Sequence, residues 1–143
     1  MIIKLLSPQV PQFFEAIKFT VKQADEVDDK DFQPYCNELL HALLNDKAQC
    51  FVRMDEKRTL IGMLVTRVMA DKVTGEKYLF IQCLYSWKAQ PDEAWMKDAE
   101  FVRQFAEKEE CQYLSFTSRN EAIWELGKKL GFVERNRVFD LRI

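Results

Sequence analysis

Side chains that could act as nucleophiles or metal ligands are few and scattered along the chain. The cysteines Cys36, Cys50, Cys83 and Cys111 contain no CxxC pair, and His41 is the only histidine. A zinc site needs closely spaced thiolates and imidazoles, so the sequence argues against a metal centre. Cys83 could serve as an acyl-accepting nucleophile only with a histidine partner and an activating environment, and its sequence neighbourhood indicates neither. We therefore expect reduced, buried thiols.

The apolar segment from Tyr78 to Trp87 offers little acid–base chemistry. Its non-aromatic polar side chains, apart from the thiol of Cys83, are Gln82 and Ser86. A reaction that removes a proton from an amine needs a base within hydrogen-bonding reach. If such a reaction occurs beside this segment, the base would be bound water or a group of the substrate.

The composition indicates one compact domain. The chain has 143 residues, of which 48% are apolar, and a formal net charge of −2. That length is typical of a single domain, and that charge gives no general attraction to nucleic acid or to an anionic membrane. No apolar run approaches the roughly 18–20 residues that span a bilayer, and the N-terminus lacks the pattern of a signal peptide. We expect a single domain over residues 1–143 in a cytoplasmic protein.

Changes in hydrophobic period divide the first half of the chain into a strand, two helices and three further strands. Helical spacing follows Pro11, and a leucine-rich stripe marks the next helix. Strand-like runs then alternate with turns at Asp55–Arg58 and Thr74–Gly75, which predicts an antiparallel meander. The expected elements are a strand at Ile2–Leu6, helices at Pro11–Ala24 and Asp31–Asn45, and strands at Cys50–Met54, Leu60–Asp71 and Lys77–Trp87.

The second half alternates helices with strands. Pro91, Asp92 and Glu93 open a helix, because proline suits the first turn and acids complement the helix dipole. Asn120 opens another helix, which Gly131 ends. A strand–helix–strand unit implies a parallel pair with a right-handed crossover. The expected elements are helices at Pro91–Glu110 and Asn120–Leu130 and strands at Gln112–Thr117 and Val133–Ile143.

This order predicts an α/β fold in which four helices cover a mixed sheet of six strands. From Asn120 to Phe132 the sequence reads NEAIWELGKKLGF, with an asparagine opening the helix and Lys-Leu-Gly-Phe closing it. The element order and this stretch resemble the GNAT superfamily of N-acetyltransferases. The resemblance implies a GNAT-like acyl-CoA N-acyltransferase fold, with acetyl-CoA as co-substrate and a small-molecule or protein amine as acceptor.

In this family an Arg/Gln-x-x-Gly-x-Gly/Ala loop before the third helix holds the pyrophosphate of acetyl-CoA. The matching residues 86–93 contain no glycine, so close backbone approach is harder. Pro91 removes one N–H donor, and Asp92 and Glu93 place negative charge where the phosphates would bind. Lys88 could supply part of a counter-charge. We therefore expect weak binding of acetyl-CoA.

The family also implies candidate site residues further along the chain. Many members use a tyrosine of the fourth helix as general acid, at the position that Gly127 occupies here. A glycine inside a helix costs up to about 1 kcal/mol relative to alanine, which suggests close approach of a neighbouring group. Tyr85 and Tyr113 are the remaining catalytic candidates, although both fit equally well as half-buried strand aromatics.

The resemblance also implies that the pantetheine arm of acetyl-CoA lies along the end of the fourth predicted strand, Lys77–Trp87, and pairs with its backbone. The expected cofactor-binding residues are Leu84, Tyr85, Ser86, Lys88 and Asn120.

Two functions remain open. The first is an acyl-CoA-dependent N-acetyltransferase, and the second is a catalytically inactive GNAT-like binding or structural protein. The missing glycines, the acids at the third helix and Gly127 favour the second. The abundance of active members favours the first, and positioning alone can supply much of the rate. We take the first as the expectation, with the acceptor and the oligomeric state open.

Overall fold

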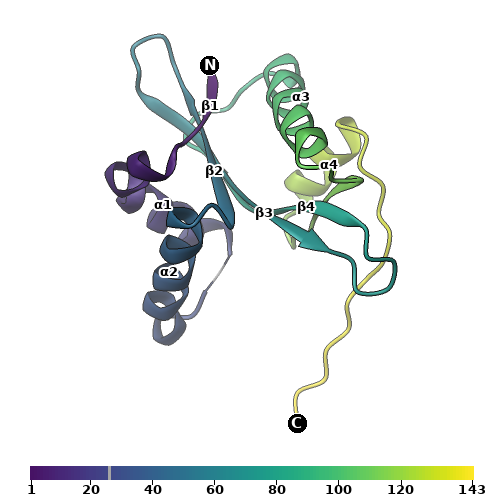
Figure 1. Cartoon of the computed structure of the whole chain (residues 1–143). Helices are drawn as coiled ribbons and strands as arrows, with labels where there is room; N and C mark the ends of the chain where they lie inside the picture. The colour runs from purple at the N-terminus through teal and green to yellow at the C-terminus, as the bar shows by residue number, and fades with distance from the viewer. Residues whose placement is uncertain (26) are drawn as a thin grey trace.

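A five-stranded mixed sheet, in the order β1-β2-β3-β4-β5, runs through the centre of the molecule (Figure 1). The structure is a computed structural model that describes residues 1–25 and 27–143. The elements in chain order are β1 (Ile2–Lys4), the 3-10 helix η1 (Ser7–Gln9), α1 (Val10–Ala24), α2 (Asp29–Leu44), β2 (Ala48–Met54), β3 (Leu60–Ala70), β4 (Lys77–Ser86), α3 (Asp92–Lys108), β5 (Tyr113–Phe116) and α4 (Glu121–Lys129).

Strands β2, β3 and β4 form the antiparallel meander that the sequence predicts. At the first turn, the carboxylate of Asp55 accepts the backbone N–H groups of Lys57 and Thr59, both at 2.9 Å. At the second turn, Gly75 has φ 75°, a left-handed conformation that glycine adopts without a steric penalty. Both turns close through local chemistry, which is why sequence patterns located them.

Strands β4 and β5 are parallel, with four residue pairs from Tyr78–Tyr113 to Ile81–Phe116. Helix α3 makes the crossover between them, with Pro91 as its N-cap residue and two acids in its first turn. The expected strand–helix–strand unit is therefore confirmed.

Helices cover both faces of the sheet (Figure 1). Helices α1 and α2 pack on one face, where Ile17, Leu39 and Val65 are fully buried in the larger core. Helix α3 packs on the other face, where Phe51 and Leu79 are buried in a smaller core. We refer below to the α1 face and the α3 face.

Helix α4 approaches the sheet closely at Gly127. A Cβ atom at this position would lie 2.7 Å from Cζ of Phe116, a distance that side chains do not tolerate. The Phe116 ring also meets Phe132 edge-on, with ring centroids 5.0 Å apart. The interpretation of Gly127 as a site of close approach is confirmed.

Asn120 opens α4 as predicted, and its side-chain oxygen accepts the N–H of Ala122 at 2.9 Å. Replacing Asn120 with alanine should lower the free energy of unfolding by about 1 kcal/mol, because one N-terminal N–H of the helix loses its partner. Urea denaturation of Asn120→Ala measures this loss. Asn136→Ala, in the exposed C-terminal segment, is the matched control. Equal stability of the two variants would show that the cap contributes nothing.

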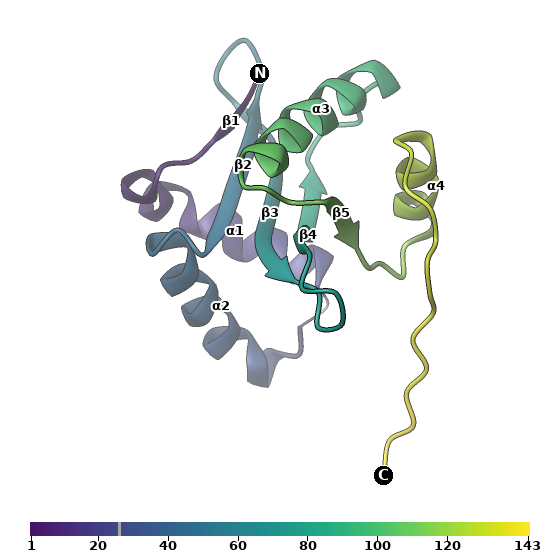
Figure 2. The ribbon, with the colours of Figure 1, turned by 45° about the vertical axis from the view of Figure 1, so that its right-hand side comes forward.

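The predicted strand at Val133–Ile143 is wrong, because these residues form no strand in the described structure. The segment starts beside β5, where the Arg135 guanidinium lies 5.4 Å from the centroid of the Tyr113 ring. It then runs away from the sheet to the C-terminus (Figure 2). Strand β5 has only four residues, so most of an eleven-residue segment would extend beyond its partner. Side-chain contacts therefore replace a backbone ladder, and Val138 and Phe139 are largely exposed.

Candidate active site

A bulge in β4 separates this strand from β5. Val65 of β3 pairs with Cys83, but the next residue, Thr66, pairs with Ile81, so Gln82 is the extra residue in β4. A bulge of this kind bends its strand and increases the local twist. Pairing with β5 also stops at Ile81. In the described part of the chain, the last five residues of β4 therefore have β3 on one side and no strand on the other.

The backbone of Leu84 and Ser86 lines this unpaired edge. Trp87 donates its N–H to the carbonyl of Ile61 at 2.9 Å, so its backbone groups face β3. Backbone direction alternates along a strand, so those of Tyr85 also face β3, whereas those of Leu84 and Ser86 face away from it. An extended ligand could pair with these two residues as a further strand would.

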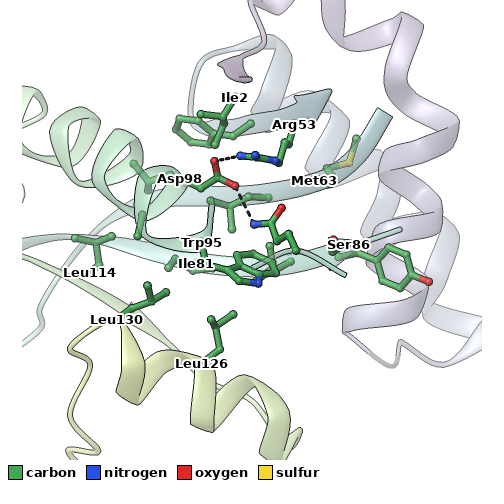
Figure 3. Close-up of a pocket in the computed structure, with 18 of the residues that line it drawn as sticks. Ile2, Arg53, Met63, Ile81, Ser86, Trp95, Asp98, Leu114, Leu126 and Leu130 are labelled. Atoms are coloured by element: carbon green, nitrogen blue, oxygen red, sulfur yellow. Dashed lines mark hydrogen bonds and ion pairs between the residues drawn. The ribbon is translucent and has the colours of Figure 1, made fainter. Parts of the chain in front are cut away.

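A pocket lies beside the unpaired edge on the α3 face (Figure 3). It has a volume of about 100 Å³ and its lining is mostly apolar. Figure 3 shows Leu114 of β5 and Leu126 and Leu130 of α4 on one side of it, and Trp95 of α3 also lines it. Such a cavity suits a narrow, uncharged chain rather than a charged head group.

One ion pair interrupts the apolar lining. Arg53 of β2 donates from Nη1 to Oδ1 of Asp98 on α3, and their side chains are 22% and 13% exposed. Gln90 donates to the other carboxylate oxygen of Asp98 at 3.2 Å (Figure 3). Nε of Arg53 is buried and has no hydrogen-bond partner in the described structure. The pair joins the sheet to α3 where the pocket opens.

The N-terminus of α3 lies close to α4. Oδ2 of Asp92 is 3.5 Å from Nζ of Lys129, and both side chains are more than half exposed. Lys88 lies instead near the first hairpin turn, with Nζ 3.7 Å from Oδ2 of Asp55. Glu93 adds a second acid to the first turn of α3. Exposed ion pairs of this kind are weak, so the negative charges of Asp92 and Glu93 are only partly compensated at the N-terminus of α3.

A polar network occupies the α1 face opposite the pocket. Tyr35 of α2 donates its hydroxyl proton to Oδ2 of Asp25, and Gln82 donates from Nε2 to the Tyr35 hydroxyl. Oε1 of Gln82 accepts from Nε of Arg67 at 2.6 Å, and Arg67 makes two bonds to Glu38, at 2.9 and 2.6 Å. The network therefore joins α2, β3, β4 and the segment after α1 at the bulge.

Burial and hydrogen bonding shift the pKa values of this network. Burial raises the pKa of Asp25 above its ordinary value, against the hydrogen bonds from Tyr35 and Gln82. Burial, together with the Asp25 carboxylate, raises the pKa of Tyr35 far above that of a free phenol. The hydrogen bond from Arg67 lowers the pKa of Glu38. Tyr35 is thus a fixed donor, and Asp25 is the group whose proton affinity burial has increased.

The sequence-based candidates occupy different places. Tyr85 lies on the α1 face beside the unpaired edge, whereas Tyr113 stacks on Tyr78 at 5.0 Å, at the opposite end of the β4–β5 pair. The pKa of the Cys83 thiol is raised, mainly by burial, so this residue is a neutral thiol at pH 7. Burial also raises the pKa of Cys50 to about 12.

Sequence reasoning missed Asp25 and Tyr35. Asp25 reads as part of an acidic connection and Tyr35 as a helix residue, and no spacing rule brings either to Gln82. Among the described residues no three potential ligands gather into a metal site, and no helix is long and apolar enough to cross a membrane.

The fold is shared with acetyltransferases of known structure. The chain superposes over 100% of its length on 97% of a probable acetyltransferase, with a TM-score of 0.76 and 12% identity. It matches 93% of the aminoglycoside N-acetyltransferase AAC(6')-Iy in complex with CoA, with a TM-score of 0.72 and 19% identity. It also matches 99% of the ribosomal-protein-alanine N-acetyltransferase from Brucella melitensis biovar Abortus 2308, with a TM-score of 0.69 and 15% identity.

No protein-family model matches the chain, and neither does any curated protein. At these identities the structural matches establish the fold. The chain therefore has the GNAT fold that its element order indicates.

Proposed function

We propose that the protein is an acyl-CoA-dependent N-acetyltransferase that uses acetyl-CoA as co-substrate. The observation that carries the proposal is the unpaired edge of β4 after the bulge, beside an apolar pocket between β5, α3 and α4. A pantetheine arm is a narrow chain with two amide groups, which offer N–H and C=O groups to a strand edge. They can therefore pair with the backbone of Leu84 and Ser86. AAC(6')-Iy, which has the same fold, was solved in complex with CoA.

The phosphates of acetyl-CoA would then lie towards the N-terminus of α3. Helix N-termini favour anions because their N–H groups point at the ligand. Lys88 lies two residues after the end of β4 and Asn120 opens α4, and we include both in the proposed binding set. Asp92 and Glu93 oppose binding there, which leads us to expect a dissociation constant on the order of tens of micromolar.

The reaction would join the amine nitrogen to the acetyl carbon and break the carbon–sulfur bond. Its main requirement is that both reactants be held in line at the edge of β4, which can supply several kcal/mol of the barrier. Gly127 offers no side chain to protonate the departing sulfur, so water or another group must do so.

A catalytically inactive binding protein is the second candidate, favoured by the acids of α3 and by Gly127. Titration calorimetry with acetyl-CoA, followed by a thiol-release assay with primary amines, separates the two. Binding with thiol release that depends on an amine supports the transferase. Binding without release for any amine supports the second candidate, and no binding contradicts the transferase and favours an inactive binding or structural protein.

The acids at α3 give a direct test of the proposed phosphate position. Replacing Asp92 with Asn and Glu93 with Gln should tighten acetyl-CoA binding several-fold at low salt, because two charges near a surface repel the phosphates. The gain should shrink as salt screens that repulsion. Calorimetry at two salt concentrations measures both effects.

The matched control places the same charge change at the other end of α3, as Glu109→Gln with Glu110→Gln. A pantetheine ligand without phosphates should bind equally to all variants. If both double variants tighten acetyl-CoA binding equally, the phosphates do not lie at the N-terminus of α3.

A further inference from the structure

The α1 face of β4 carries polar and aromatic side chains that the proposed donor site does not use. The bulge turns Gln82 and Cys83 to this same face, as their contacts with α2 and with the α1 core show. Tyr85 follows on the same face, against Phe19 of α1. An acceptor reaching the thioester from the side opposite the pocket would meet these residues.

The network at the bulge has a net negative charge. Asp25 and Glu38 are carboxylates and Arg67 is the guanidinium between them, so two negative charges face one positive charge. Glu38 holds Arg67 through two bonds, so no cation of the described residues pairs with Asp25 as Arg67 pairs with Glu38. Lys22, in the last turn of α1, pairs with Asp29 instead. A small cation would therefore be stabilised beside Asp25.

An aromatic cluster lies further along the same strand. The Tyr85 ring meets Phe19 edge-on at 5.3 Å and Trp87 at 5.1 Å, and Phe19 stacks on Trp87 at 5.8 Å. Phe19 is 42% exposed and Trp87 is 37% exposed, so the cluster presents open ring surface. From Gln82 to Tyr85 is three residues, or about 10 Å along a strand.

We infer that the acceptor is a primary amine attached to an aromatic ring, with its ammonium group at Asp25 and its ring on Tyr85 and Trp87. This inference rests on the proposed acetyl transfer. The negative charge at Asp25 favours an ammonium group, and the exposed rings near Tyr85 and Trp87 favour an aromatic ring. A two-carbon linker between the ammonium group and the ring can span the distance between these two places.

Asp25 also has a chemical task in this arrangement. The ammonium must lose one proton before its nitrogen can attack, and the Asp25 carboxylate accepts that proton. When the carbon–nitrogen bond has formed, the carbon–sulfur bond breaks, and the second amine proton ends on the CoA sulfur through water. Asp25 then releases its proton to solvent. Tyr35 and Gln82 are positioning residues that hold the carboxylate.

The first experiment measures binding of 2-phenylethylamine to the full chain without acetyl-CoA, by NMR titration. Asp25→Asn and Trp87→Ala should each weaken binding about tenfold, by loss of the charge and of the ring contact respectively. Asp28→Asn, in the same connection, and Phe139→Ala, an exposed aromatic residue of the C-terminal segment, are the controls and should bind as the native protein does. n-Butylamine, which lacks the ring, should bind more weakly than 2-phenylethylamine and be insensitive to Trp87→Ala.

The second experiment measures acetyl transfer to 2-phenylethylamine as a function of pH. Asp25→Asn should lower kcat/KM about 100-fold, as expected for loss of a general base. The native rate should fall only at acidic pH, where the Asp25 carboxylate takes up a proton, whereas the rate of the variant should rise with pH up to the pKa of the amine, because only the neutral amine can then attack. Among the described residues, Tyr35 of α2 and Cys83 of β4 are the titratable groups that interact with Asp25, and Arg67 of β3 joins the network through Gln82. Tyr35→Phe removes one bond to Asp25 and should lower kcat/KM less while keeping the acid limb.

The outcomes separate this inference from the proposed function. Transfer to amines with no preference for 2-phenylethylamine, and with Asp25→Asn unchanged, would overturn the inference and leave the transferase standing. Equal 2-phenylethylamine binding by Asp25→Asn and Asp28→Asn would overturn it as well. Ring-dependent amine binding that needs Asp25, in a protein that binds no acetyl-CoA, would support the amine site and contradict the transferase.

Discussion

Replacing Asp98 with leucine should lower the free energy of unfolding by about 3 kcal/mol. The Arg53–Asp98 pair is largely removed from water, and breaking such a pair leaves an uncompensated charge in the protein. Within the part of the chain that the structure describes, the buried Nε of Arg53 has no hydrogen-bond partner, and Asp98 is the acceptor for its Nη1. Chemical denaturation of Asp98→Leu measures the loss.

Two further variants test the cause of that loss. Arg53→Met combined with Asp98→Leu removes both charges, and it should recover most of the stability, because apolar replacement of a buried pair is often neutral. Glu107→Leu changes an exposed acid of the same helix and should cost much less. If the double variant were no more stable than Asp98→Leu, lost packing rather than the stranded charge would explain the effect.

Most of the fold could be predicted because its signals are local. Turn residues such as Gly75, the cap at Asn120 and the change of period after α2 each specify one element, and the order of elements then allows few topologies. The parallel β4–β5 pair follows from this order without any pairwise contact being known. Gly127 was also interpretable, because a helix-interior glycine without a backbone role indicates a close neighbour.

The bulge at Gln82 could not be predicted. The segment from Tyr78 to Trp87 contains no glycine, proline or charge that would mark an irregularity. The extra residue lies where the two neighbours of β4 differ. Strand β4 continues to pair with β3 beyond this point, but its pairing with β5 ends after four residues. Only the three-dimensional sheet shows that conflict, and the unpaired edge depends on it.

The Asp25 network escaped prediction for a related reason. Tyr35 is ten residues from Asp25 and 47 residues from Gln82, so their contact comes from the packing of two helices on the sheet. The same holds for the Asp92–Lys129 pair, which joins the start of α3 to the end of α4. The predicted last strand failed in the opposite sense, because the sequence of Val133–Ile143 does not show that β5 has only four residues with which to pair.

The unpaired edge of β4 leads to the second large expected effect. Leu84→Pro should weaken acetyl-CoA binding at least about tenfold, because the substitution removes an outward N–H and a good hydrogen bond can contribute about 1.5 kcal/mol. Proline is tolerated in a strand where its missing N–H faces away from the neighbouring strand. The ladder with β3 should therefore survive, and circular dichroism with a thermal melt verifies folding before calorimetry is done.

Leu84→Ala is the matched variant, since it removes the same side chain from the pocket and keeps the backbone N–H. It should lose only the apolar contact, so it should bind acetyl-CoA more tightly than Leu84→Pro. Tyr85→Pro, by contrast, removes an N–H that faces β3 and should destabilise the sheet itself. If folded Leu84→Pro bound as well as Leu84→Ala, no ligand would pair with this edge. The proposed transferase would then lose the observation that carries it, even though the GNAT fold would stand.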